Sequence, residues 1–446
     1  MMSEKRSVLS LGIDDADSPL GMCTTYVCAV LVENLASFVE FLDYPLLIRF
    51  NPNIPYKTRG NGGFCLRFVA EEVGVDGVFE MVLDTLVSLA DFHHPDTNTG
   101  VVMYEGEEVP REIQLFGESV VTGIKSIEEG RLLAEKYGMR VFAHGNGRGI
   151  IGALGAIGNV LRNFDHTYEY MAYRVPEMWG KPRRIDRDSV FEMDRKMGQR
   201  TFNNIDFETE RVLITPRGPD PVFFGIRGED PEIVKEAAGM VKTLEPVERW
   251  VIFRTNQGTD AHLKRAYKIK EVEPYLPVII EGEVSSKPET VQGGHAVFKL
   301  SDETGFIDCA AYEPTGAFRN VIKSLIIGDN VVVYGGIRPP NKIPITVNLE
   351  KIEVKRLAQK IVRTNPPCLK CGKNMKSMGK NQGYECKKCK IVLSKAEKIV
   401  KVLPREIKKG KYVPPPRAQR HLTRPITREN FRNITPYLLI KWWHYP

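Results

Sequence analysis

Three carboxylates lie within four positions near the start of the chain, directly after an apolar stretch with β-strand character. They are Asp14, Asp15 and Asp17, and residues 21–25 follow at an expected helix start. Carboxylates crowded this closely repel one another unless a cation lies among them, and hard oxygen ligands of this kind suit Mg²⁺. The simpler interpretation is an Asp-rich turn that caps the next helix. Thr24 has the same two interpretations: a helix cap, or, beside a metal–phosphate site, a hydroxyl that accepts a phosphoryl group.

Two glycine-rich loops in the same part of the chain carry basic residues suited to phosphate. The first covers residues 51–63, and the second covers residues 144–149 and runs directly into an apolar stretch. Basic side chains can neutralise phosphate while backbone N–H groups approach it, and a helix N-terminus favours an anion. Either loop alone is usually just a turn, but with the aspartates they predict nucleotide binding. The candidate ATP-binding residues are Lys57, Arg59, Gly60, Gly62, Arg148 and Gly149.

Four of the eight cysteines form two Cys-x-x-Cys pairs with fourteen residues between them. Four thiolates at this spacing are typical of a closed tetrahedral Zn²⁺ site with a structural role. The metal would replace the core that a module this small cannot build. Disulfides are the alternative, which a cytosolic setting disfavours. The predicted zinc ligands are Cys368, Cys371, Cys386 and Cys389.

The charge of the chain is divided unevenly along its length. Residues 351–446 hold 25 Lys and Arg against 5 Asp and Glu, a net charge of +20, whereas residues 1–350 carry −13. This division predicts a polyanionic partner gripped by the basic end, unless that end is a solvated, disordered tail. Residues 401–446 end in Trp442-Trp443-His444-Tyr445 and predict a flexible arm whose aromatic rings stack on bases. Alternatively, these rings pack back onto the protein.

Length and composition describe an ordinary multidomain globular protein. The chain has 446 residues, of which 42% are hydrophobic and 27% charged. No apolar run approaches the roughly 18 residues of a membrane span, and the N-terminus lacks the pattern of a signal peptide. We therefore expect a cytoplasmic protein with no membrane partner.

The periodicity of apolar residues predicts a multidomain fold of α/β and β type. Residues 1–162 form an α/β domain, in which Ser126 and Glu129 have the spacing of a capping box. Its expected strands are 8–13, 46–50 and 64–69, and its expected helices are 22–38, 78–92, 127–137 and 150–161.

Three smaller units follow along the chain. Residues 163–272 have the β-α-β-β-α-β order of a ferredoxin-like domain, with strands expected at 168–175, 212–215, 221–226 and 248–255 and helices at 188–197 and 232–244. Residues 273–356 predict a five-stranded OB-fold barrel with a helix after the third strand, or else an unrelated small β-sandwich. Residues 357–446 form the zinc ribbon with its basic tail. The barrel strands are expected at 278–284, 295–300, 306–312, 330–335 and 345–352, and the helix at 320–325.

Taken together, the motifs resemble the TiaS family, the archaeal synthetases that make 2-agmatinylcytidine in the isoleucine tRNA with a CAU anticodon. The resemblance covers nearly the whole chain and the same order of domains, from a kinase-like catalytic domain to a zinc ribbon. The tail beyond about Pro404 matches least well. The motifs that carry the resemblance are Gly12–Ser18, Gly21–Thr25, Asn51–Gly62, Gly147–Ala153 and Arg254–Asp260.

The resemblance implies an ATP-dependent ligase. ATP is converted to AMP, the 2-oxo group of the wobble cytidine is phosphorylated, and the primary amine of agmatine displaces the phosphate. By position, Asp14, Asp15 and Asp17 would hold Mg²⁺ and handle phosphates, and Thr24 would be the autophosphorylated threonine. The last motif would lie near tRNA or agmatine, because a carboxylate such as Asp260 can pair with a guanidinium, but a structural turn is an equal alternative. The residues considered for that contact are Arg254, Asn256 and Asp260.

Two other functions compete with this one. A non-enzymatic single-stranded nucleic-acid-binding protein also combines OB folds with a zinc ribbon, but it leaves the aspartates and both glycine-rich loops unexplained. A nuclease or nucleotidyltransferase could use the three aspartates for two-metal catalysis.

Overall fold

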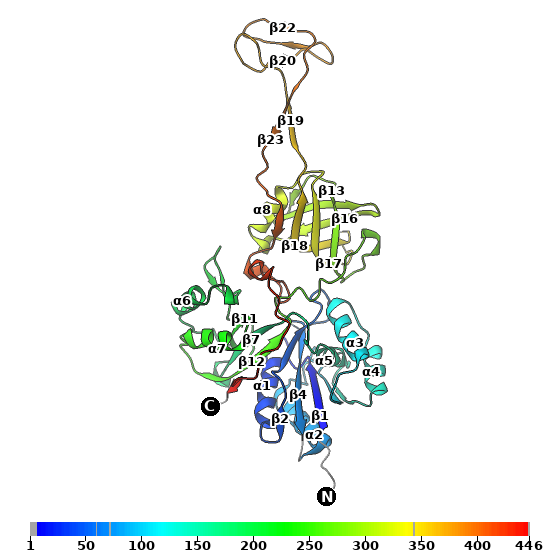
Figure 1. The fold of residues 1–446 in the computed structure, drawn as a ribbon, viewed down its shortest axis with the longest axis vertical. Coiled ribbons are helices and arrows are strands. Elements are labelled where there is room, and N and C mark those ends of the chain that lie inside the picture. The colour runs from blue at the N-terminus through cyan, green and yellow to red at the C-terminus, as the bar shows by residue number, and fades with distance from the viewer. Residues whose placement is uncertain (1–6, 59, 71–72, 342–343, 445–446) are drawn as a thin grey trace.

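The chain forms a broad base of two α/β units, a β-barrel above it and a small cysteine-containing module at the end of a thin stalk (Figure 1). This is a computed structural model, and it describes residues 7–58, 60–70, 73–341 and 344–444. A single sheet of 11 strands runs through both units of the base. Among the described residues, no helix has the length and apolar composition that crossing a bilayer requires.

The N-terminal unit is built around β1 (Ser7–Asp14), which pairs antiparallel with β4 (Gly62–Ala70) and β5 (Gly100–Glu105). Alternate side chains of β1 are fully buried on one face. Helix α5 (Gly149–Gly158) packs on the other face, where a Cβ at Gly12 would overlap the helix backbone. The close approach therefore depends on glycine. The remaining elements of this unit are α1 (Thr24–Leu35), β2 (Val39–Phe41), β3 (Leu46–Arg49), α2 (Gly74–Leu89), α3 (Arg111–Thr122), α4 (Ile127–Lys136) and β6 (Arg140–Ala143).

All strands and helices predicted in this part of the chain are present, with ends shifted by a few residues. The capping box is confirmed, because Glu129 N donates to Ser126 Oγ at 3.2 Å and Ser126 N donates to Glu129 Oε2 at 2.8 Å. Strands β2, β5 and β6 and helix α3 were not predicted from the sequence.

The second unit has the ferredoxin-like strand order β12-β7-β11-β8. The strand predicted at 212–215 is wrong: β10 (Arg211–Val212) pairs only with β9 (Ile205–Asp206), and β8 (Thr201–Phe202) is the strand beside β11. Leu213 and Ile214 are apolar because they line a cavity rather than because they join the sheet. The other elements are β7 (Thr167–Arg174), α6 (Arg187–Met197), β11 (Val222–Gly228), α7 (Pro231–Met240) and β12 (Val247–Thr255).

The two units share their sheet through a parallel pairing of β3 and β12. Arg254 lies opposite Leu46, and Thr255 lies opposite Leu47. Because the hydrogen-bonded ladder continues from one unit into the other, their relative orientation is fixed by backbone as well as by side chains.

The barrel is a closed five-stranded OB fold, so the β-sandwich alternative is wrong. The first strand pairs with the second and the fourth, and the third pairs parallel with the fifth, which closes the sheet on itself. The short helix α8 (Phe318–Lys323) follows the third strand as predicted. The five strands are β13 (Pro277–Val284), β15 (His295–Asp302), β16 (Gly305–Ala311), β17 (Asn330–Arg338) and β18 (Thr346–Arg356).

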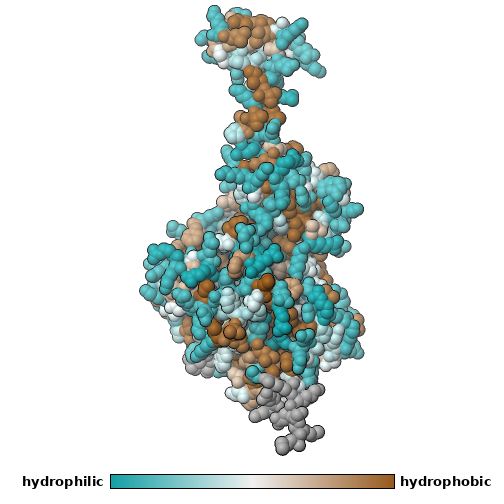
Figure 2. Space-filling model, in the orientation of Figure 1, coloured by the Kyte–Doolittle hydropathy of each residue, from teal (hydrophilic) through white to brown (hydrophobic). Residues whose placement is uncertain are grey.

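The stalk is a two-stranded ribbon of β19 (Lys360–Thr364) and β23 (Ile399–Leu403). Apolar side chains such as Ile361 and Val400 are exposed along it, and Figure 2 shows the apolar surface that they form. The ribbon carries a three-stranded module made of β20 (Lys376–Ser377), β21 (Tyr384–Glu385) and β22 (Val392–Leu393).

After β23 the chain returns to the base, in what we call the return segment, residues 404–444. Strand β24 (Gly410–Tyr412) pairs with the barrel strand β18, and β25 (Trp443–His444) pairs with β12. Trp442 is only 5% exposed and packs edge-on against Phe41. The expectation of a flexible arm is therefore wrong, and Trp442, Trp443 and His444 pack back onto the protein as in the alternative. Tyr445 lies outside the described residues.

Most of the arginines of the return segment are neutralised inside the protein. Arg424 and Arg428 are buried and share the carboxylate of Asp165, at 2.6 and 3.1 Å. The basic end therefore does not act as one continuous nucleic-acid-binding surface, because the acidic body already compensates part of its charge. The other internal pairs are Arg405–Asp329, Arg417–Asp206, Arg420–Glu350 and Lys411–Glu429.

Candidate functional site

A cavity of about 370 Å³ lies between the N-terminal unit and the ferredoxin-like unit. It brings together side chains from β1, the start of α1, both glycine-rich loops and the return segment. Nine of the predicted site residues line it, whereas Arg59 lies outside the described residues. These nine are Asp14, Asp15, Asp17, Thr24, Lys57, Gly60, Gly62, Arg148 and Gly149.

The aspartates occupy the turn that ends β1. Asp15 has a φ of 58°, a left-handed conformation that aspartate tolerates better than most residues. Its carboxylate accepts hydrogen bonds from Thr58 Oγ1 at 3.1 Å and Asn98 N at 3.2 Å. Burial, and then the charge of Asp15, raise the pKa of Asp14 well above its usual value. Burial, and then the charge of Asp17, raise the pKa of Asp15 to about 6.

Raised pKa values are the expected result of carboxylates crowded without a cation. A divalent ion would relieve this repulsion, so the residue types fit Mg²⁺. In the part of the chain that the structure describes, however, only the four zinc-ribbon cysteines bring three or more ligand atoms within 4.8 Å of one another. The aspartates therefore fit an ion that takes one or two carboxylates and completes its shell with phosphate and water, as Mg²⁺ commonly does.

Thr24 is the first residue of α1, and its side chain does not cap the helix. The N-cap position belongs to Cys23, which makes no capping hydrogen bond through its side chain. Thr24 Oγ1 instead accepts a hydrogen bond from Ala16 N at 3.2 Å, within the aspartate turn. The interpretation of Thr24 as a cap is wrong, and its hydroxyl lies beside the acidic residues.

Arg148 and Lys57, the basic residues of the two loops, are held at the cavity by different contacts. The guanidinium of Arg148 stacks on the ring of Tyr56, 3.9 Å from its centre, which fixes a flexible side chain at the cavity wall. Lys57 Nζ donates to the carbonyl of Pro52, and burial lowers its pKa.

The N-terminus of α5 is less open to an anion than the sequence suggests. Gly149 N already donates to Asn98 O at 3.0 Å, and Arg148 N donates to Asn146 Oδ1 at 2.9 Å. Phosphate contact at this end would therefore come from the Arg148 side chain rather than from these two amides.

Four charged or titratable residues line the cavity without having been predicted from the sequence. They are Arg49, Glu169, Arg227 and His421. Arg49 lies two residues before the first glycine-rich stretch and could have been noticed. The other three come from strand interiors and from the return segment, where no local pattern marks them.

The three residues considered for contact with tRNA or agmatine lie outside this cavity. Arg254 is buried, and its Nη2 donates to Asp43 Oδ2 at 2.6 Å and to Val160 O at 3.1 Å. Asn256 bonds to the backbone of Arg49 through both its amide atoms. Asp260 pairs with Lys351 at 2.5 Å and accepts a bond from Arg424 N. These contacts join the ferredoxin-like unit to its neighbours.

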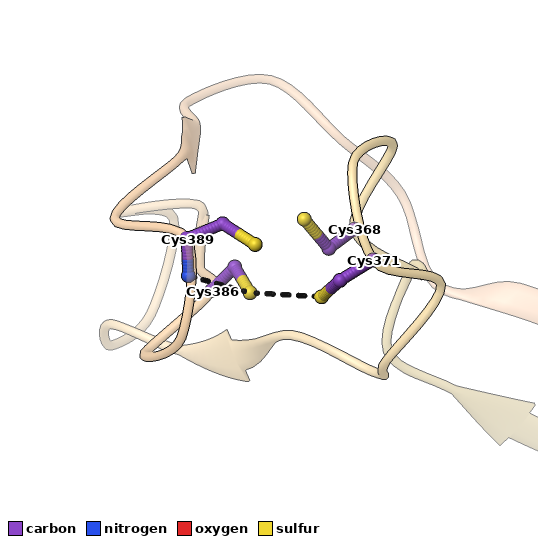
Figure 3. A group of neighbouring side chains, drawn as sticks. All are labelled: Cys368, Cys371, Cys386 and Cys389. Carbon is purple, nitrogen blue, oxygen red and sulfur yellow. Dashed lines mark hydrogen bonds between the residues drawn. The ribbon is translucent and has the colours of Figure 1, made fainter.

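The four cysteines of the distal module face one another (Figure 3). All four sulfur atoms lie within 4.8 Å of one another, and Cys371 Sγ is 3.6 Å from Cys386 Sγ. The module's buried core is otherwise almost confined to Met375. The donor set and spacing fit a structural Zn²⁺, which would supply the stability that this small core lacks.

Comparison with known proteins matches each of the four units to a described family. Residues 10–146 match the TiaS TCKD domain, and residues 147–262 match the TiaS FLD domain. Residues 278–355 match an OB-fold nucleic acid binding domain, and residues 365–407 match the TiaS C-terminal zinc ribbon domain.

Relatives and solved structures agree over nearly the full length. Proteins named as the isoleucine-tRNA 2-agmatinylcytidine synthetase TiaS are similar to the chain: that of Methanocaldococcus jannaschii is 42% identical over 94% of this chain and 98% of its own length. The protein of Pyrococcus horikoshii is 44% identical over 94% of this chain and 97% of its own length. The structure of TiaS in complex with its isoleucine tRNA and ATP superposes with a TM-score of 0.87 at 39% identity, covering 95% of this chain and 98% of that one. The structure of TiaS in complex with the same tRNA, AMPCPP and agmatine superposes with a TM-score of 0.83 at 36% identity, and it covers 95% of this chain and 98% of that one.

Proposed function

The chain belongs to the TiaS family of isoleucine-tRNA 2-agmatinylcytidine synthetases, and from this premise we propose that its central cavity is the site of reaction. The enzyme joins agmatine to the 2-oxo carbon of the wobble cytidine in the isoleucine tRNA with a CAU anticodon, at the expense of ATP. One observation carries the assignment of the site. Three aspartates, a threonine hydroxyl and cationic side chains, far apart in the sequence, line a single cavity.

ATP is converted to AMP in this proposal, and the cytidine passes through a phosphorylated intermediate. A carbonyl oxygen is a poor leaving group, and phosphorylation turns it into a good one. The amine nitrogen of agmatine then forms a bond to C2 while the C2–O bond breaks. The phosphate leaves with the electron pair, and the nitrogen loses a proton.

Each side chain has a role that follows from its chemistry. Asp14, Asp15 and Asp17 would hold Mg²⁺, which when bound neutralises phosphate charge. Lys57 and Arg148 bind phosphate oxygens as cations, and we assign Arg59 to the same role. Glycines at positions 60 and 62 let the backbone come close to the nucleotide. Gly149 instead lets the start of α5 approach the backbone of residues 98–100, and its amide is already bonded to Asn98 O.

Thr24 is the proposed phosphoryl acceptor. Its Oγ1 uses a lone pair toward Ala16 N, so the oxygen is held in place within the acidic turn. When this oxygen attacks a phosphoryl group of the nucleotide, an O–P bond forms and the bond from that phosphorus to the departing phosphate oxygen breaks, with the electron pair going to that oxygen. The hydroxyl proton passes to a neighbouring carboxylate. The carboxylate of Asp15 lines the same cavity.

The distal module is the proposed tRNA-binding surface. Residues 365–398 carry nine lysines against two glutamates, and among the described residues none of these lysines forms an ion pair. Lysines free of protein partners release counterions when they meet a phosphate backbone. We place the reaction in the cytoplasm, in line with a tRNA substrate and reduced cysteines.

One assay tests the proposal against its rivals. The protein is incubated with radiolabelled ATP and a CAU-anticodon transcript, with and without agmatine, and AMP and the modified nucleoside are followed. The expected result is AMP in the presence of transcript and 2-agmatinylcytidine only when agmatine is added. Tight RNA binding without AMP would instead favour a binding protein, and cleavage or extension of the transcript would favour two-metal nuclease or nucleotidyltransferase chemistry.

A further inference from the structure

The return segment contributes one side chain to the cavity, the imidazole of His421. The backbone around it is tightly held, because Gly258 N donates to His421 O at 2.9 Å and Asp260 N donates to Leu422 O at 2.8 Å. Leu422 is 1% exposed and belongs to the core of the N-terminal unit. On either side, Arg420 and Arg424 form ion pairs with Glu350 and Asp165. His421 is therefore fixed in the cavity wall although it lies in a segment without regular structure.

The imidazole completes a ring of four polar side chains in contact with one another. Glu169 Oε1 accepts from Arg227 Nε at 2.9 Å, and Arg227 Nη2 lies 3.0 Å from His421 Nδ1. The same Nδ1 lies 3.0 Å from Gln257 Oε1, and Gln257 Nε2 donates back to Glu169. Glu169 and Gln257 are 3% and 0% exposed, so this support is rigid.

The ring leaves one nitrogen of the imidazole for the cavity. The contacts of the imidazole with the ring are made at Nδ1, whereas Nε2 faces the phosphate loop, 3.7 Å from where a Cβ at Gly60 would lie. Gln257 Nε2 is used toward Glu169, so Gln257 Oε1 faces Nδ1 as an acceptor and takes its proton. Arg227 Nη2 can only donate, so its 3.0 Å approach to the protonated Nδ1 is a contact of charge and not a hydrogen bond. The lone pair of the imidazole then lies on Nε2. A histidine held through one nitrogen with the other turned to the reactants is the arrangement that proton-transfer groups use.

The charges around His421 keep it neutral. The charge of Arg49 is the main cause that lowers the pKa of His421 well below its usual value, and Arg227 and Lys57 act in the same direction. The surrounding protein atoms add to this effect although the imidazole is open to the cavity. Glu169 is the acidic group of the ring and is itself paired with Arg227. A neutral imidazole can accept a proton, and phosphate in the cavity would offset the surrounding cations and favour that acceptance.

We propose that His421 is a catalytic residue of this enzyme, which takes at Nε2 the proton that the primary amine loses as it attacks C2 of the phosphorylated cytidine. This inference rests on the proposed function. The N–C2 bond forms and the C2–O bond breaks, and the phosphate leaves with the electron pair. The proton passes from the amine nitrogen to Nε2 and then to the departing phosphate or to water.

The test compares the parent enzyme with His421→Ala and His421→Gln on a CAU-anticodon transcript, with ATP and agmatine. The readout is the ratio of 2-agmatinylcytidine to AMP. We expect this ratio to fall by about 100-fold in both variants, a loss typical for removal of a general base. Added imidazole should restore part of the ratio in His421→Ala and have no effect on the parent enzyme. His93→Ala, at an exposed position outside the cavity, is the matched control and should behave as the parent.

Each other outcome has a separate meaning. If the parent enzyme makes no 2-agmatinylcytidine, the proposed function is overturned and the role of His421 with it. If the parent is active and either variant keeps the parental ratio, the proton-transfer role alone is overturned. A glutamine retains the volume and the contact with the ring, so recovery in His421→Gln would show that the residue only positions its neighbours. Equal losses of AMP and product without rescue by imidazole would also overturn the proposal.

Discussion

The carboxylate of Asp14 occupies the space in which a side chain at Gly152 would lie. Gly152 is a buried residue of α5, and the helix packs against β1 at this point. The position of the acidic cluster is therefore set by a helix backbone that comes from a different part of the chain.

Gly152→Ala should damage both stability and catalysis. A methyl group there would overlap the Asp14 carboxylate, so we expect a loss of about 1–3 kcal/mol in the free energy of unfolding, as for overpacked cores, and slower formation of AMP because Asp14 is displaced. Chemical denaturation and the radiolabelled ATP assay measure the two effects.

Two variants separate the overlap from a general effect of alanine. Gly239→Ala lies in α7, where a Cβ meets nothing within 4 Å, and should leave AMP formation unchanged while adding up to about 1 kcal/mol of stability through helix propensity. In Asp14→Ala/Gly152→Ala the overlap with the carboxylate is removed and only the approach of the two Cβ atoms at 2.8 Å remains, so part of the stability should recover while AMP formation does not. Parental AMP formation by Gly152→Ala would contradict the packing argument.

Asp15→Asn tests the metal and phosphate role of the turn. The substitution keeps the shape of the side chain but removes its charge, so we expect AMP formation to fall by roughly two orders of magnitude or more, on the scale seen when one electrostatic group is lost from an active site. Binding of tRNA, measured by filter retention, should stay at the parental level because the distal lysines are remote. Asp76→Asn, at an exposed aspartate paired with Arg140, is the control. Undiminished AMP formation by Asp15→Asn would refute the role.

Removal of the distal module should weaken tRNA binding and flatten its salt dependence. Thr364 and Ile399 lie opposite each other in the stalk, so residues 365–398 can be replaced by Asn-Gly, a turn that joins two such strands. The deletion takes away nine lysines, and the slope of log affinity against log salt should become shallower. ATP binding should persist. Truncation at residue 357 would be a poorer design, because it also removes His421 and the buried Trp442.

An unchanged salt slope after the deletion would mean that other surfaces hold the tRNA. Zinc chelation offers an independent check, since loss of the metal should unfold the module alone. The parent protein treated with a chelator should then bind tRNA as weakly as the deletion variant.

His166 makes the stability of the two α/β units depend on pH. It is fully buried, its Nδ1 lies 2.9 Å from Phe164 O, and among the described residues its Nε2 has no partner. Burial lowers its pKa to about 4. Between pH 6.5 and 4 the unfolded chain thus binds a proton that the folded chain does not, so stability falls as the pH falls through this window. The shift corresponds to about 3 kcal/mol.

In His166→Gln the free energy of unfolding should fall less between pH 6.5 and 4 than in the parent, and the difference should be about 3 kcal/mol. Urea denaturation at a series of pH values measures it. His93→Gln, which removes an exposed imidazole, should leave the curve as in the parent. If both variants gave the parental slope, the titration of His166 would not contribute to acid sensitivity.

Local patterns predicted the parts of this fold that local contacts determine. The capping box at Ser126, the strand that ends at Asp14 and all five barrel strands follow from spacing and alternation within one segment. The strand expected at 212–215 failed because a short apolar run also arises where residues line a cavity and pack on the core, as Ile214 does.

The rest of the site depends on contacts between distant segments. His421 meets a partner 194 residues away, at Arg227, and its own neighbours in the sequence give no sign of it. Arg254 shows the converse: its motif allows either a contact with tRNA or agmatine or a structural role, and in the fold its side chain is buried against Asp43. Sequence spacing identifies residues that can do chemistry, but it does not reveal which of them the fold turns inward.

Trp442 distinguishes a packed C-terminus from a nucleic-acid-binding arm. It is 5% exposed, with its ring 5.4 Å from that of Phe41, and the next residue pairs with β12. Trp442→Ala should therefore cost about 3–5 kcal/mol of unfolding free energy, the usual range for a buried tryptophan, and leave tRNA affinity unchanged below the melting transition. Leu438→Ala, at a side chain that is 90% exposed, should change neither quantity. If Trp442→Ala instead weakened tRNA binding at parental stability, the indole would be stacking on bases, and the packing of the return segment would need another explanation.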